Sequence, residues 1–129
     1  MNPTHIMSKH DQLPAAFRVH SLADARAALA RGVPVTLDSA PGAALHAGCG
    51  WWRALIEQAR ADHPNTICVD ILDCADGTGQ ALAALRIGVT RLVLWPSAPG
   101  REAVVAIAEA NGGFALAEAP PVAALARIP

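Results

Sequence analysis

Cysteine and aspartate side chains are the residues of this sequence best suited to chemistry. Cys49 stands just before a helix that the sequence predicts from Trp51, where free amides and the helix dipole would lower the pKa of a thiol. Asp73 and Cys74 follow a buried apolar strand. Cys49, Asp73 and Cys74 are therefore weak catalytic candidates, and the usual alternative for each cysteine is a buried, inert thiol.

A cysteine before a helix is also found in the loops of rhodaneses and tyrosine phosphatases, which such a position resembles. Those loops end in an arginine that binds the oxyanion of the substrate. Here Arg53 follows inside the helix, too soon after Cys49, and the bulky Trp51 and Trp52 fill the interval. The spacing therefore does not carry that activity over to this chain.

Two glycine-containing segments predict a ligand site. The segment 39–50 is long for a connection between a strand and a helix, and long loops of this kind often carry function. The run Asp76-Gly77-Thr78-Gly79 precedes a helix, whose free amides bind anions. A plain turn with a helix cap is the alternative for this run. We expect a small molecule or an anion to contact Ser39, Gly48, Trp51, Gly77, Thr78 and Gly79.

The sequence predicts no metal and no cofactor. His46 and Cys49 are three residues apart, and with Asp73 and Cys74 they make a conceivable zinc set, but no second paired motif supports it. No Walker lysine and no G-x-G-x-x-G run is present, so the usual nucleotide-binding motifs are missing.

Asp70 lies inside a near-continuous apolar run, 66–72, that predicts a strand. A buried carboxylate without a partner costs several kcal/mol. Two interpretations stay open: the strand is an edge or ends earlier than predicted, or the acid is held there for a function.

Strands and helices alternate along the chain. Apolar runs predict strands at 16–20, 33–37, 66–72, 91–95 and 114–117. Periodic apolar positions predict four helices between them, with inward stripes such as Trp52, Leu55, Ile56 and Ala59, or Val104, Ile107 and Ala108. This order predicts right-handed crossovers and a parallel sheet.

We expect an α/β three-layer sandwich with a mostly parallel, flavodoxin-like sheet of four or five strands. The flavodoxin-like order would make the first and third strands neighbours and bring His20 and Ser21 beside Asp73 and Cys74. An open half-barrel of four strand–helix units is the alternative. Residues 81–94 (ALAALRIGVTRLVL) resemble the helix–Gly–strand units of barrel aldolases, a likeness that follows from the fold class.

Composition limits the functional classes. The chain has 129 residues, a net charge of −1 and a single lysine, Lys9, so it lacks the basic face of a nucleic-acid-binding protein. No apolar run is long enough to span a membrane, and residues 1–14 lack an apolar h-region, so we expect neither a membrane span nor a secretory signal. Its three cysteines, odd in number, are best read as reduced thiols in the cytoplasm.

Residues 1–14 are predicted to be a flexible tail, 15–118 a single domain and 119–129 a Pro-rich tail with apolar residues that would dock on the body or a partner. Hydrophobic residues make up 53% of the chain and charged ones 16%, which predicts a homo-oligomer, most simply a dimer. The expected function is binding of a small molecule or anion in a crevice at the carboxyl edge of the sheet. An assembly module without catalytic activity and a cysteine-based enzyme are the alternatives.

Overall fold

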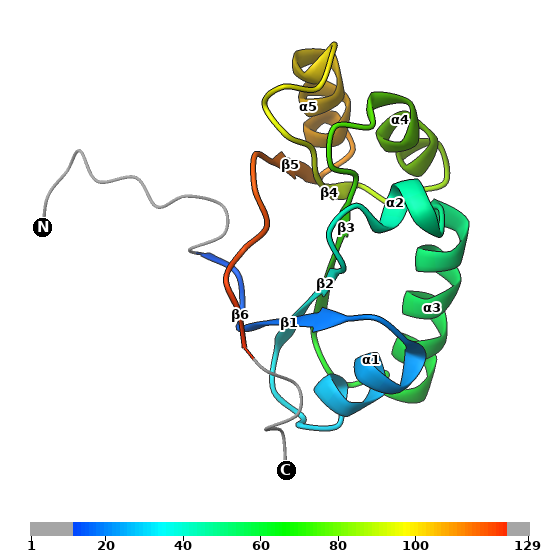
Figure 1. Ribbon diagram of the computed structural model, residues 1–129. Helices are drawn as coiled ribbons and strands as arrows, with labels where there is room; N and C mark the ends of the chain where they lie inside the picture. The colour runs from blue at the N-terminus through cyan, green and yellow to red at the C-terminus, as the bar shows by residue number, and fades with distance from the viewer. Residues whose placement is uncertain (1–11, 124–129) are drawn as a thin grey trace, which may run out of the picture.

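The computed structural model describes residues 12–123 as one open sheet of six parallel strands flanked by helices (Figure 1). The strand order is β5-β4-β3-β2-β1-β6. In chain order the elements are β1 (Ala16–Val19), α1 (Leu22–Leu29), β2 (Val35–Ser39), α2 (Ala43–His46), α3 (Cys49–Asp62), β3 (Cys68–Asp73), α4 (Thr78–Arg86), β4 (Arg91–Val93), α5 (Arg101–Ala110), β5 (Phe114–Leu116) and β6 (Val122–Ala123).

The predicted fold class is confirmed: the molecule is an α/β domain built around a parallel sheet that helices flank. The order of the strands is sequential from β1 to β5, so β2 lies between β1 and β3. The flavodoxin-like adjacency of the first and third strands is therefore wrong. From β1 to β5 each crossover moves the chain one strand further in the same direction, and the connection from β5 to β6 then returns the chain to the outer side of β1.

The helices cover one face of the sheet. Successive helices pack side by side, α1 on α3, α3 on α4 and α4 on α5, as a right-handed sequential winding requires. Figure 1 shows these helices on one side and the connection from β5 to β6 on the other. On that second face Ile71, Val93 and Leu116 form a smaller apolar cluster, against which Leu13 and Ala119 pack.

The main core lies between the helices and the sheet. The predicted inward stripe of α3 is confirmed, and Trp52 is fully buried. Ile107 is an exception among the predicted inward positions: it is 40% exposed, whereas Val104 and Ala108 are buried. A helix packed along a narrow line on its neighbours buries only the centre of its apolar face.

Several local features differ from the predicted boundaries. The 39–50 segment contains the short helix α2, and α3 begins at Cys49 rather than at Trp51. The described part of the predicted C-terminal tail includes β6, which pairs in parallel with β1. Residues 1–11 and 124–129, which make up most of the two predicted tails, lie outside the described residues.

Candidate carboxyl-edge site

All six strands end at the same edge of the sheet, and this edge gathers polar side chains from β2 and β3. The register pairs Asp38 with Ile71, so Asp73 extends two residues beyond Asp38 on the neighbouring strand. The hydroxyl of Ser39 accepts a hydrogen bond from the backbone N–H of Asp73 at 2.8 Å. Asp38, Ser39 and Asp73 therefore lie close together at this edge. His20 and Ser21, at the end of β1, are one strand further from Asp73 than predicted.

Asp73 joins the loops that follow β2 and β3. Its Oδ1 accepts the N–H of Gly42 at 3.1 Å and that of Ala75 at 2.9 Å. Gly42 and Ala75 both have positive φ, 68° and 49°, and Ala75 adopts this left-handed conformation despite its Cβ. The buried Asp73 carboxylate therefore fixes the backbone of the edge and has one oxygen engaged by two amides.

Asp38 is the buried acid with the least complete set of partners. Strand alternation points Leu37 into the main core and Asp38 to the opposite face. Arg18 Nε donates to Asp38 Oδ2 at 3.3 Å, while Asp38 Oδ1 is buried and has no hydrogen-bond partner among residues 12–123. Burial, and secondarily the charge of Asp73, raises the pKa of Asp38 to about 7 against the opposing effect of Arg18. Asp38 therefore exchanges its proton near neutral pH.

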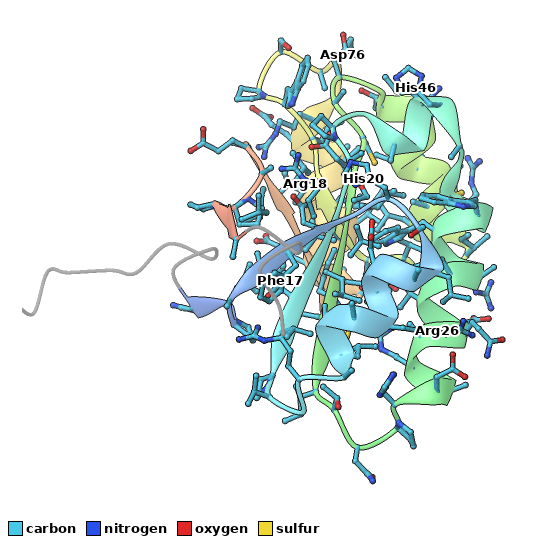
Figure 2. The ribbon with its side chains drawn as sticks, turned by 60° about the horizontal axis from the view of Figure 1, so that its bottom comes forward. Phe17, Arg18, His20, Arg26, His46 and Asp76 are labelled. Atoms are coloured by element: carbon cyan, nitrogen blue, oxygen red, sulfur yellow. The ribbon has the colours of Figure 1, made fainter. Side chains whose placement is uncertain are left out.

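Arg18 forms the solvent-facing side of this pair. Its side chain is 27% exposed, and no hydrogen bond within the described part of the chain uses its two terminal nitrogens. Figure 2 places Arg18 and His20 along β1 and its end, well apart from His46 and Asp76. Within the described residues, the two terminal nitrogens of Arg18 are therefore available to a ligand at this edge. In the sequence, Arg18 is marked only by its position two residues before His20 on a predicted strand. It was not predicted to belong to the site.

The three cysteines differ in burial: Cys74 is buried, whereas Cys49 and Cys68 are partly buried. Cys74 is fully buried, and burial, followed by the charge of Asp73, raises its pKa to about 12. Burial likewise raises the pKa of Cys68 to about 11. Both thiols are therefore protonated at neutral pH. Cys49, the first residue of α3, is partly buried and packs against the main core.

The run at residues 76–79 is mainly a turn that begins α4. The N–H of Gly77 bonds to the carbonyl of Cys74, and Gly77, not Thr78, occupies the cap position. The Thr78 hydroxyl donates to the carbonyl of Pro99, which ties α4 to the loop before α5. A Cβ on Gly77 would approach Leu45 Cδ2 to 2.5 Å, whereas Gly79 faces open space. This turn therefore packs against α2 as well as beginning a helix.

The remaining predicted ligand residues lie at the start of α3. Gly48 precedes the helix with a φ of 84°, and Trp51 is 37% exposed with its ring 5.9 Å from that of Trp52. No hydrogen bond within residues 12–123 connects Gly48 or Trp51 to the Arg18–Asp38 pair. A cavity of about 280 Å³ lies further along the same edge, lined by Pro96, Ala98, Gly100, Arg101 and Glu102.

Asp70 is neither at a strand edge nor outside its strand. It lies in β3, which pairs with β2 and β4, and its carboxylate contacts Arg60 and Arg91, each at 2.7 Å. Neither an edge position nor an earlier end of the strand therefore explains Asp70, which lies inside a central strand. Its partners are 10 and 21 residues away in the chain, a distance over which sequence patterns carry no pairing signal.

The fold and this edge define a parallel α/β domain with a half-satisfied buried acid next to an arginine. No family model, curated protein or solved structure matches the chain. Within residues 12–123, no three His, Cys, Asp or Glu side chains lie close enough to hold a metal ion. None of the described helices is both long and apolar enough to cross a membrane.

Proposed function

We propose that this domain binds a small molecule carrying an anionic group at the carboxyl edge of the sheet, next to Arg18 and Asp38. The observation that carries the proposal is the buried Asp38 carboxyl, which has one oxygen without a partner in the described chain, beside an arginine with free donors. Parallel α/β sheets commonly bind ligands at this edge. Buried polar groups left unpaired in a native structure are often explained by a function.

The protonation of Asp38 controls the charge that Arg18 presents. Below pH 7 the Asp38 carboxyl is neutral, so the guanidinium of Arg18 has an uncompensated positive charge. Above pH 7 the ionised carboxylate pairs with Arg18 and competes with an incoming anion. Anion binding is therefore coupled to proton uptake, and the affinity falls as the pH rises through 7.

An NMR screen of the full chain against small carboxylates and phosphates at pH 6 tests the proposal. The expected hits shift the amide signals of residues 17–20 and 37–42, bind more weakly at pH 8, and lose affinity in Arg18→Gln. Arg26→Gln is the matched control, because Arg26 is an exposed arginine that pairs with Asp62 on the helix side. Hits that are indifferent to Arg18→Gln, or a screen without hits at this edge, would refute the proposal.

The assembly module stays the alternative function, because large apolar side chains are exposed on several elements. Ile67 is 67% exposed and Trp95, after β4, is 43% exposed. A homodimer would cover part of this surface. The cysteine-based enzyme is the lesser alternative and rests on Cys49 alone, since the thiols of Cys68 and Cys74 are protonated.

A further inference from the structure

A second set of charged side chains surrounds a cavity of about 320 Å³ on the helix side of the sheet. The cavity lies between α3 and the turn that leads into β4, toward the amino ends of β3 and β4. It is therefore separate from the carboxyl edge and shares no lining residue with the Arg18–Asp38 pair. Its lining consists of Arg53, Ile56, Glu57, Arg60, Asp70, Ile87, Gly88, Val89 and Arg91.

Asp70 holds two of the three arginines in place. Its Oδ1 accepts a hydrogen bond from Nη2 of Arg60 and another from Nη2 of Arg91, each at 2.7 Å. Arg60 also donates to the carbonyl of Cys68, and Arg91 Nε donates to the carbonyl of Asp70. Burial opposes ionisation of Asp70, but the two guanidinium groups outweigh it and lower the pKa of the carboxyl. Both guanidinium groups are therefore fixed before any ligand arrives.

The three arginines keep unused donors at the cavity. Arg53 Nε donates to Glu57 Oε1 at 2.8 Å. Within residues 12–123, no hydrogen bond uses Nη1 of Arg60, Nη1 of Arg91 or either terminal nitrogen of Arg53. The lining thus carries three positive and two negative groups, a net charge of +1. Planar guanidinium groups with free N–H donors match the geometry of carboxylate and phosphate oxygens.

The same cavity has an apolar side. Ile56 and Val89 are buried, and Ile87 is partly buried. The volume is near the lower limit of about 300 Å³ for small-molecule pockets. Such a pocket has room for an oxyanion together with a small apolar group.

We propose that this cavity is a second binding site, for a small organic molecule that carries one oxyanion group on a compact apolar body. The oxyanion lies against Arg53, Arg60 and Arg91. The apolar body lies against Ile56, Ile87 and Val89. Asp70 does not touch the ligand; it is a positioning residue that holds two of the arginines.

NMR titration of the full chain with phenyl phosphate, benzoate and phenol tests this site. Phenyl phosphate carries a phosphate group and benzoate carries a carboxylate. The probe that binds more tightly shows which of these oxyanions the site prefers. Phenol carries the apolar body alone and is expected not to bind. The amide signals of residues 87–91 and of α3 around Arg53 are expected to shift, while those around Arg18 report the carboxyl-edge site.

Two variants change the affinity in opposite directions. Arg53→Gln removes a donor and a charge, so binding weakens about tenfold, the size of one charged hydrogen bond. Glu57→Gln removes a competing carboxylate and strengthens binding. Both side chains are half or more exposed, so the fold is not at risk. Arg86→Gln removes the same charge next to the cavity without touching it, and is expected to change the affinity less than about twofold.

The proposal is overturned if neither oxyanion probe shifts residues 87–91 at about 10 mM, a concentration that detects even weak sites. It is also overturned if Arg86→Gln weakens binding as much as Arg53→Gln, since the effect would then be general charge. Equal binding of phenol would overturn the role of the arginines. None of these outcomes depends on the carboxyl-edge site, which Arg18→Gln tests separately.

Discussion

Three aspartates are buried among residues 12–123, and their oxygens are satisfied to different degrees. Asp70 binds two guanidinium groups and Asp73 binds two backbone amides, so both carboxylates are stabilised. Asp38 has one long hydrogen bond from Arg18 and one oxygen that accepts no hydrogen bond from any described residue. The incomplete pairing of Asp38 therefore lowers the folding stability of the domain, a cost that is common at binding sites.

Substituting Asp38→Asn is expected to stabilise the protein, and more so at high pH. The pKa of Asp38 is raised from 3.8 to about 7, so the folded state binds the proton more tightly than the unfolded chain. The wild type then loses stability as the pH rises from about 4 to 7, because Asp38 must ionise while buried. The neutral amide avoids this cost. Urea unfolding at pH 8 is expected to show a gain of about 1–3 kcal/mol for the variant.

The pH dependence separates this effect from a general change in packing. At pH 5 the folded wild type has a protonated Asp38, so the advantage of the amide is expected to shrink. Arg26→Gln, on the helix side, is the control and is expected to show no comparable pH-dependent gain. An Asp38→Asn variant that is less stable than the wild type at both pH values would contradict the prediction.

The three thiols are expected to differ in reactivity toward iodoacetamide in the native protein. Cys74 is buried and Cys68 is partly buried, and their pKa values are raised to about 12 and about 11, so alkylation is slow at both. Cys49 is partly exposed and is expected to react first. Mass spectrometry of digested samples at intervals measures each site. Alkylation of Cys74 at the rate seen in urea would mean that the edge around Asp73 opens in solution.

At the scale of the elements, a close backbone approach determines how β5 joins the sheet. Gly113 precedes β5, and a Cβ at this position would come within 2.0 Å of the carbonyl oxygen of Thr90. The next amide, Phe114 N–H, bonds to the same carbonyl at 3.0 Å. Only glycine fits between the two segments and lets β4 and β5 pair in register.

Gly113→Ala is therefore expected to destabilise the domain by at least about 2 kcal/mol, because the clash is with backbone that cannot rotate away. Gly50→Ala is the matched control. Gly50 lies in α3 with open space at its Cβ position, so alanine is expected to stabilise the helix by up to about 1 kcal/mol. Thermal unfolding of both variants compares them. Equal effects of the two substitutions would show that the close approach to Thr90 does not exist.

Local patterns predicted most elements, and contacts between distant residues explain what they missed. Strand–helix alternation and the buried stripe of α3 follow from apolar periodicity, which is visible in the sequence. The direction in which each crossover moves is not encoded locally, so the sequential strand order was not foreseen. The four-residue α2 is too short for periodicity, and the pairing of Asp38 with Arg18 spans 20 residues.

The sequence predicted some of the residues at the carboxyl edge, but not Arg18 and its pairing with Asp38. Ser39 and Asp73 were expected at the carboxyl edge, and the hydrogen bond between them confirms it. Asp38 directly follows the predicted strand 33–37, but neither its burial nor its partner is visible in the sequence. In the sequence, Arg18 is an ordinary polar residue of a short predicted strand. Only the assembled sheet shows that it faces Asp38.

At the scale of the whole molecule, the sheet stays open at β5 and β6. Val122, in the edge strand β6, is 39% exposed, and other large apolar side chains are exposed at both ends of the sheet. Open edges and apolar surface favour association with another copy. Sedimentation velocity at micromolar concentrations is expected to show a dimer. If the protein is a monomer over the whole concentration range, the assembly function is contradicted and only the ligand-binding proposal remains.

The central claim is that Asp38 is a buried acid with incomplete partners that changes its protonation near neutrality. Carbon-detected NMR of its carboxyl group during a pH titration measures this directly. The account predicts a midpoint of about 7 in the wild type, and a higher midpoint in Arg18→Gln because the stabilising charge is gone. A midpoint near the ordinary value of 3.8, unchanged by Arg18→Gln, would mean that Asp38 is solvated or fully paired and would contradict the account.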